Sequence, residues 1–242
     1  MKRLWKGLIA ALILVFSLSG AALAAELVVN GGFETGDATG WTAVNMGSGG
    51  GDFFIMSGTT TPINSFTVLP PPDGTYAAMT DQLGAGTHIL YQDIAVPAGG
   101  STQFSATIYL NNQAGAWIIG PGLDSTTTPN QQFRVDIMNP AAAADDVGAG
   151  VLMNVYQTQP GDSSTLGYTT ISADLSAYAG QTVRIRFAEV DNQFYLNTGV
   201  DQVSAISTVA AAVPTMNEWG MIVFMLLAGV GSIFFLKRRQ QA

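Results

Sequence analysis

A two-residue alternation of apolar and polar side chains constrains this sequence more than any other feature. Val183, Ile185 and Phe187 are apolar, and the positions between them are Arg184 and Arg186. In a β-strand, successive side chains point to opposite faces, so this pattern predicts one buried face and one polar face. Such strands are typical of antiparallel sheets.

Segments of this kind recur through the middle of the chain, where helical periodicity is nearly absent. They are rich in β-branched and aromatic residues and are separated by Gly, Pro, Asn and Asp. We therefore predict an all-β domain in which two antiparallel sheets pack face to face, a β-sandwich or jelly roll. Long, mobile loops are expected at Gly47–Asp52, Gly120–Asn130 and Pro140–Gly150. The predicted strands are Thr75–Thr80, His88–Val96, Gln103–Leu110, Gln132–Met138, Val151–Thr158, Gln181–Val190 and Val200–Ser207.

The N-terminus has the organisation of a secretory signal peptide. Basic residues occupy positions 2, 3 and 6, an apolar run follows from Leu8 to Leu18, and Ala22-Leu23-Ala24 has the small-x-small form of a cleavage site. We predict a signal peptide over residues 1–25. The alternative is an uncleaved anchor, which the short apolar run disfavours.

An uncharged run of 17 residues, Gly220–Leu236, lies near the C-terminus and is followed directly by Lys237-Arg238-Arg239. Its length is at the lower end of what crosses a bilayer, and a basic cluster marks the cytoplasmic side of a membrane span. A buried core helix is the alternative. The predicted organisation is a β-sandwich over 26–208, a linker and sorting motif over 209–219, a transmembrane helix over 220–236 and a basic tail over 237–242.

The charge of the middle segment restricts its partners. Residues 26–212 contain three basic residues and 16 of the 17 acidic residues of the chain, a formal net charge of −13. Such a surface repels phosphate backbones, so a nucleic-acid partner is not expected, whereas divalent cations suit it. The chain has no cysteine, which excludes disulfides, cysteine nucleophiles and thiolate metal sites.

The segment before the apolar run, Val213-Pro-Thr-Met-Asn-Glu-Trp-Gly220, resembles an IPTL-CTERM sorting signal. Val213 and Met216 replace the Ile and Leu of that signal. The resemblance implies an inner-membrane-anchored precursor, an exosortase-type processing enzyme, and delivery to the cell surface or extracellular matrix of a Gram-negative bacterium. A plain anchor helix with an accidental motif is the alternative. The matching positions are Pro214, Thr215, Glu218, Trp219 and Gly220.

A second resemblance covers most of the middle segment. The opening stretch Leu27–Trp41 and the closing stretches Asp174–Glu189 and Gly199–Val203 are similar to those of galactose-binding-like jelly rolls and carbohydrate-binding modules. The resemblance implies that the first and last strands lie side by side, often bridged by structural calcium. It assigns this calcium to Glu34 and Asp201, with backbone carbonyls of Gly36 and Asp37 as further ligands. Alternatively, Glu34 and Asp201 are turn and edge residues.

Catalytic signatures are scarce, and we predict that the protein is not an enzyme. His88 is the only histidine. It opens a predicted strand and is expected to be a surface or cross-strand residue. With one histidine, the chain cannot form a zinc site made of several histidines. A carboxylate pair for glycoside hydrolysis stays open. Among the strand carboxylates Asp93, Asp136 and Glu189, Asp136 is expected to face solvent or pair with an arginine.

The predicted function is therefore that of a non-catalytic, exported structural or adhesive β-sandwich. The alternative is a carbohydrate-binding module for exopolysaccharide, and a glycan-cleaving enzyme is a third hypothesis. Sugar binding needs exposed aromatic side chains beside polar groups. The candidate platforms are Trp117, Tyr156, Phe194 and Tyr195, each with core packing as its alternative; Trp41 is expected in the core.

Overall fold

The computed structural model describes residues 23–126, 128–209 and 218–240. It contains a β-sandwich over Leu23–Val209 and a C-terminal helix, which are separate units. The predicted signal sequence up to residue 22, and the sorting-motif residues Pro214 and Thr215, lie outside the described residues.

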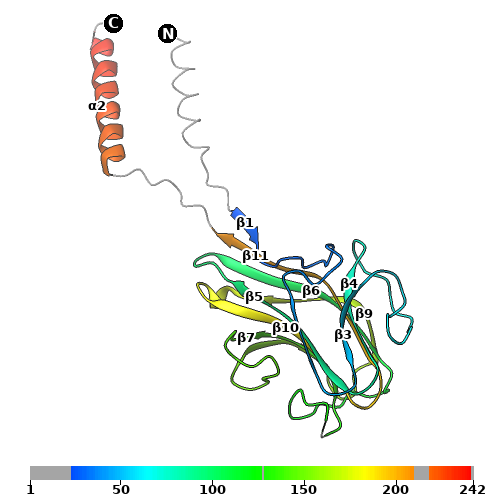
Figure 1. Cartoon of the computed structure of the whole chain (residues 1–242). Helices are drawn as coiled ribbons and strands as arrows, with labels where there is room; N and C mark the ends of the chain where they lie inside the picture. The colour runs from blue at the N-terminus through cyan, green and yellow to red at the C-terminus, as the bar shows by residue number, and fades with distance from the viewer. Residues whose placement is uncertain (1–22, 127, 210–217, 241–242) are drawn as a thin grey trace. The chain divides into compact units, whose positions relative to one another are not determined.

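Two antiparallel sheets form the sandwich, as predicted (Figure 1). The first has the strand order β3-β4-β11-β6-β9, and β1 pairs with the end of β11. Its strands are β1 (Leu23–Glu26), β3 (Gly51–Met56), β4 (Ala77–Gln82), β6 (Ser101–Asn112), β9 (Thr165–Asp174) and β11 (Leu196–Val209).

The second sheet has the strand order β2-β5-β10-β7-β8. The chain crosses between the sheets at each step from β4 to β7 and again from β8 to β11, which is the winding of a jelly roll. A single short 3₁₀ turn, Ser176–Tyr178, follows β9 within the described residues. The strands of this sheet are β2 (Thr42–Met46), β5 (Gly86–Ala95), β7 (Gln131–Met138), β8 (Val151–Gln157) and β10 (Thr182–Asp191).

All seven predicted strands are confirmed within a few residues at their ends, and four further strands were not predicted. Two of these, β3 and β9, lie at edges of the first sheet, and β9 is partly or fully exposed along its whole length. The alternation in β9 is interrupted at Thr169-Thr170, next to the shift in its register with β6, so each half of the strand shows only a short pattern. β3 begins inside the segment that we expected to be a loop, Gly47–Asp52.

The beginning and the end of the domain lie together, as the second resemblance implies. Leu23–Glu26 pairs with Ile206–Val209, and the Leu27 N–H donates to the Ala205 carbonyl. β11 is interrupted by a bulge between Asp201 and Ser204, where Gln202 has a φ of 50°. The opening segment packs so tightly on this bulge that a Cβ on Gly31 would lie 1.8 Å from the Val203 carbonyl oxygen. Only glycine permits this approach.

The main core lies between the sheets and is closed at one end by aromatic rings. Phe33 and Trp41 have ring centroids 5.5 Å apart, and Trp41 lies 6.0 Å from Phe187 of β10. Val183, Ile185 and Phe187 are fully buried on the inner face of β10, as their alternation predicts. Trp41 is therefore a core residue, as expected.

The outer face of the second sheet is covered as well. Asp136 was expected to face solvent or pair with Arg134 or Arg184; the pairing with Arg134 is confirmed, but Asp136 is fully buried and its second partner is Arg186. Arg186 is also fully buried and donates to the carbonyls of Ala144 and Asp146 at 2.6 and 2.7 Å. The segment Pro140–Gly150 is thus tied down over the sheet rather than free in solvent.

The C-terminal helix α2 spans Glu218–Gln240 and includes the basic cluster in its last turn. Its segment Gly220–Gln240 is long and apolar enough to cross a membrane, with a mean hydropathy of 2.0 and no buried residues in its most apolar window. The apolar helix predicted over 220–236 is therefore confirmed as a helix, and it continues four residues further.

Candidate functional site

The candidate binding site is a cavity of about 210 Å³ at one end of the sandwich, where two turns that cross from one sheet to the other meet. One turn joins β4 to β5, and the other joins β10 to β11. The two turns are more than a hundred residues apart in sequence, and they adjoin because β4 pairs with β11, and β5 pairs with β10. The lining residues are Leu83, Gly84, Ala85, Asp191, Asn192, Gln193, Phe194 and Tyr195.

Two of the residues that line this cavity have large, exposed apolar side chains. Leu83 is 66 % exposed and Phe194 is 54 % exposed, one from each turn. The Tyr195 ring lies edge-on to Phe194, with centroids 5.0 Å apart, and 5.1 Å from Phe66 on its other side. A half-exposed aromatic ring supported by further rings offers a rigid apolar platform to a ligand.

The turn that carries Phe194 is held from beneath by a buried glutamine. Gln131 donates from Nε2 to the Phe194 carbonyl at 2.9 Å, and its Oε1 accepts from the Gln193 N–H at 3.1 Å. The Asn192 Oδ1 accepts the Asn130 N–H at 2.7 Å. The platform is therefore pre-organised by hydrogen bonds to β7 and the segment before it.

Of the four aromatic platforms predicted, the structure brings Phe194 and Tyr195 to this cavity. Trp117 is buried, and its indole N–H donates to the Ser163 carbonyl at 2.8 Å, so core packing describes it. Tyr156 is half-buried and packs against Phe133, with centroids 6.2 Å apart. Neither residue lines the cavity.

A second cavity, of about 310 Å³, lies between the Met46–Gly47 turn and the loop around Leu123. The described residues that line it are small, aliphatic or acidic, and none is aromatic. It therefore offers no stacking platform.

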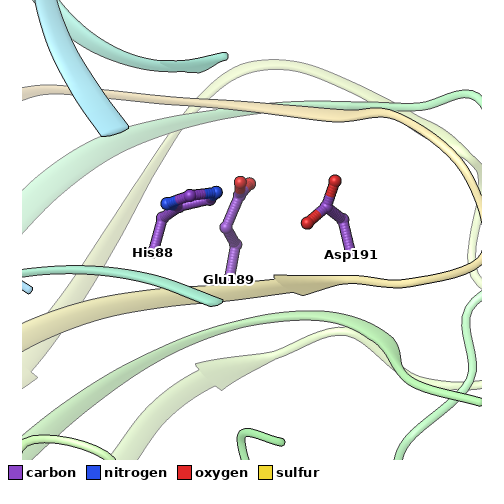
Figure 2. Close-up of side chains that lie close together, drawn as sticks. All are labelled: His88, Glu189 and Asp191. Carbon is purple, nitrogen blue, oxygen red and sulfur yellow. The ribbon is translucent and has the colours of Figure 1, made fainter. Parts of the chain in front are cut away.

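Three titratable side chains gather between the sheets beneath the first cavity: His88, Glu189 and Asp191 (Figure 2). His88 of β5 stands directly opposite Glu189 of β10 in the register, and Asp191 follows two residues later on the same face. Each can offer one ligand atom within 4.8 Å of the others. His88 was expected to be a surface or cross-strand residue; it is a cross-strand residue and is 99 % buried.

Burial dominates the electrostatics of this cluster. It raises the pKa of Glu189 well above its usual range, reinforced by the charge of Asp191, and it raises the pKa of Asp191 to about 7. Burial also lowers the pKa of His88 to about 4. The imidazole is therefore neutral at pH 7.

Glu34 and Asp201 lie near each other, where the opening segment packs on the β11 bulge. A Cβ on Gly32 would lie 3.8 Å from both Asp201 Oδ1 and Glu34 Cγ. Glu34 accepts the backbone N–H groups of Thr75 and Tyr76 at 2.9 Å. Asp37 instead accepts hydrogen bonds within its own loop, from Thr35 and Thr39, and its carbonyl oxygen is already used by Asn30.

Asp201 is fully buried, and its Oδ2 has no hydrogen-bond partner. Burial raises the pKa of Asp201 to about 7, and the charges of Asp73 and Glu34 raise it, although hydrogen bonds from the Gln202 and Asp73 N–H groups lower it. Asp73 was not identified from the sequence as a possible ligand. It lies in a turn that is distant in sequence from both Glu34 and Asp201. An unpartnered carboxylate oxygen is a suitable ligand for a hard cation such as calcium, but among the described residues Glu34, Asp73 and Asp201 do not bring their carboxylate oxygens within 4.8 Å of one another.

No protein-family model and no curated protein sequence matches this chain. Similar solved structures include TmCBM61 bound to β-1,4-galactotriose, at 11 % identity and a TM-score of 0.46, covering 75 % of this chain and 97 % of that one. Another is the K3 cleaved adhesin domain of Lys-gingipain from Porphyromonas gingivalis W83, at 13 % identity and a TM-score of 0.47, covering 76 % and 99 %. A Stig cyclase from Fischerella sp. TAU has 17 % identity and a TM-score of 0.43, covering 78 % and 100 %. At these identities the similarity concerns the fold, and one fold serves many functions.

Proposed function

We propose that this protein is a non-catalytic, exported β-sandwich that binds polysaccharide at the cavity between the β4–β5 and β10–β11 turns. The observation that carries the proposal is the half-exposed Phe194 ring in a braced turn beside the polar side chain of Gln193. The Asn192 amide braces the turn by donating to the carbonyls of Ser125 and Thr128. Sugar rings have an apolar face of C–H groups and a rim of hydroxyls. An aromatic platform next to an amide group complements both.

Phe194→Ala is the most direct test of this proposal. The full chain, purified in detergent, would be applied to a glycan array and to exopolysaccharide from the producing organism. We expect wild-type binding, and a loss of about 2 kcal/mol, roughly thirtyfold in affinity, on truncating the platform. Because Phe194 is half-exposed, folding should be preserved, and circular dichroism would check it.

Leu152→Ala is a matched control, because Leu152 is an exposed apolar residue of β8 that does not line the cavity. It should bind like the wild type. Equal binding by Phe194→Ala and the wild type would refute the cavity as the site. A flat result on every glycan, with the protein still found outside the cell, would favour a purely structural or adhesive role. Release of shorter glycans would favour the glycan-cleaving alternative.

The proposal includes sorting by the C-terminal segment. The uncharged run Gly220–Leu236 of α2, followed by three basic residues in the last turn of the helix, supports an inner-membrane-anchored precursor. Processing by an exosortase-type enzyme at the IPTL-CTERM-like motif would then deliver the domain to the surface or matrix of a Gram-negative bacterium. Glu26 would remain after signal cleavage, and it holds the mature N-terminus by accepting the Ala205 N–H at 2.8 Å.

Intact-mass analysis tests the sorting. We expect the exported protein to begin at Ala25 or Glu26, which would remove the first residues of β1, and to end near the motif. A Pro214→Ala variant should keep its C-terminal helix and stay in the membrane fraction. Recovery of the full-length chain, with both ends intact, from the soluble interior of the cell would contradict this.

We further propose that calcium binds between Glu34 and Asp201, with Asp73 as a neighbouring carboxylate. The buried, unpartnered Asp201 Oδ2 supports this assignment. A bound calcium ion would be coordinated by both carboxylates and would thereby link the opening segment to the β11 bulge. Its role would be structural.

A further inference from the structure

We propose that a divalent transition-metal ion of the zinc type binds between the two sheets, to His88 Nε2 and to the carboxylates of Glu189 and Asp191. This site is separate from the calcium assignment, and it does not depend on saccharide binding. It rests on the geometry of three buried side chains and on two of their atoms that have no partner.

The hydrogen bond of His88 fixes which ring nitrogen is free. Nδ1 lies 2.9 Å from the side-chain oxygen Oδ1 of Asn45, which can only accept, so Nδ1 carries the proton of the neutral ring. Nε2 therefore presents its lone pair, and it is buried without a hydrogen-bond partner. This is the tautomer of a metal-ligating histidine, whose other nitrogen donates to an oriented oxygen.

Glu189 is held in the same manner. Its Oε2 accepts from the Thr80 Oγ1 at 2.8 Å, across the space between the sheets, while its Oε1 is buried and unpartnered. The His88 ring and the Glu189 carboxylate stand next to each other in Figure 2, with a ring nitrogen towards the carboxylate. With the proton on Nδ1, Nε2 and the carboxylate oxygen Oε1 both present lone pairs, and neither has a hydrogen-bond partner.

Asp191 completes the set and is fixed by two donors. The Gly86 N–H donates to Oδ1 at 2.9 Å, and the Gln82 Nε2 donates to Oδ2 at 2.6 Å. The amide oxygen of Gln82 is itself buried and unpartnered, so a fourth potential ligand atom lies beside the cluster. Ligands that are oriented by outer hydrogen bonds are the usual design of a protein metal site.

Glycine leaves the space in front of Nε2 open. A Cβ on Gly86 would lie 2.7 Å from His88 Nε2 and 3.6 Å from Asp191 Oδ1, so any side chain here would compete with an ion. The cavity above is lined by Asp191, which gives an ion a route to the cluster.

The charge balance also calls for a cation. In the part of the chain that the structure describes, the ion pairs involve Asp93 and Asp136, and none reaches Glu189 or Asp191. Two buried carboxylates without a positive partner are costly unless a proton or a metal ion neutralises them. A nitrogen ligand together with carboxylate oxygens suits zinc better than calcium.

His88 allows an unusually direct test, because it is the only histidine of the chain. The full chain would be produced without a histidine tag, labelled with ¹⁵N at histidine, purified in detergent and stripped with EDTA. On adding Zn²⁺ we expect the single Nε2 resonance to shift and to return on adding EDTA. An Nε2 resonance that stays in place in saturating zinc would overturn the site, because a proton would then be the only occupant.

Glu189→Gln removes one ligand charge with little change of shape, and we expect it to weaken zinc binding at least tenfold, roughly the scale on which metal-site partners act. Asp162→Asn makes the same chemical change in an exposed turn outside both proposed metal sites and should bind zinc like the wild type. Wild-type zinc affinity in Glu189→Gln would overturn the assignment of that ligand. If Glu189→Gln fails to fold, judged by circular dichroism, the wild-type Nε2 resonance decides alone.

Discussion

Arg186→Met is expected to lower the free energy of unfolding by about 3–5 kcal/mol, because it leaves a buried carboxylate and buried carbonyls short of their donor. Arg186 is fully buried, pairs with Asp136, and donates to the carbonyls of Ala144 and Asp146. Asp136 would keep the paired hydrogen bonds from Arg134, both of 2.7 Å, and one of 2.8 Å from Asn154 Nδ2, but would lose one of its two cations. Denaturant unfolding of the full chain in detergent, followed by tryptophan fluorescence, measures the change.

Arg184→Met provides the matched control, since it removes an arginine two residues away on the same strand. Arg184 pairs with Asp93, which is 36 % exposed, and its guanidinium lies 3.9 Å from the centre of the Tyr91 ring. Arg184 is buried, but its ion-pair partner is partly exposed and its contact with the covering segment is one hydrogen bond of 3.3 Å to the Ala142 carbonyl, so we expect a smaller loss of about 1 kcal/mol. Similar small losses for both variants would show that the segment Pro140–Gly150 does not depend on Arg186.

Calcium is expected to raise the stability of the wild type, by about 2.7 kcal/mol at a hundredfold excess over its dissociation constant. Asp201→Asn should abolish this increase, because it removes the charge of the buried carboxylate whose Oδ2 lacks a partner. Thermal unfolding in calcium and in EDTA gives the comparison.

Asp37→Asn controls for a general loss of acidic charge. Its side chain accepts hydrogen bonds from Thr35 and Thr39 within its own loop, so the variant should keep the calcium response. An equal calcium response in Asp201→Asn and the wild type would contradict the assignment, whatever the two variants do to stability in EDTA.

The alternation of apolar and polar side chains predicts most of the fold, and it also bears on the cluster of His88, Glu189 and Asp191. The same periodicity that buries Val183, Ile185 and Phe187 continues to Glu189 and Asp191, which the structure places on the same inner face. Extended by two more alternate positions, the pattern predicts that Glu189, opposite His88, and Asp191, opposite Gly86, are buried. Acidic side chains are usually exposed to solvent, so residue type alone gives no reason to expect Glu189 and Asp191 in the core.

The outer face of the second sheet could not be predicted in the same way. Asp136 alternates with apolar neighbours and therefore points away from the main core, as expected. It is buried because the segment Pro140–Gly150 folds back over it, held by the Arg186 guanidinium. A segment rich in alanine and glycine carries no periodicity from which this contact could be read.

The cavity shows a similar limit. Phe194 and Tyr195 could be named as candidate platforms from their residue type, but Leu83 could not be joined to them. The two turns meet only through the pairing of β4 with β11 and of β5 with β10, which is a property of the topology. The bracing of Phe194 by Gln131 has no sequence signal either.

Hydrogen exchange measured by mass spectrometry on the full chain, with and without a saturating glycan chosen from the array, tests most directly whether saccharide binds at this end of the sandwich. We predict slower exchange in the turns 83–85 and 192–195, and unchanged exchange in the 3₁₀ turn and the edge strand β9, which lie outside the cavity lining. Protection elsewhere on the sandwich, or no protection in these two turns under saturating glycan, would contradict the proposed site.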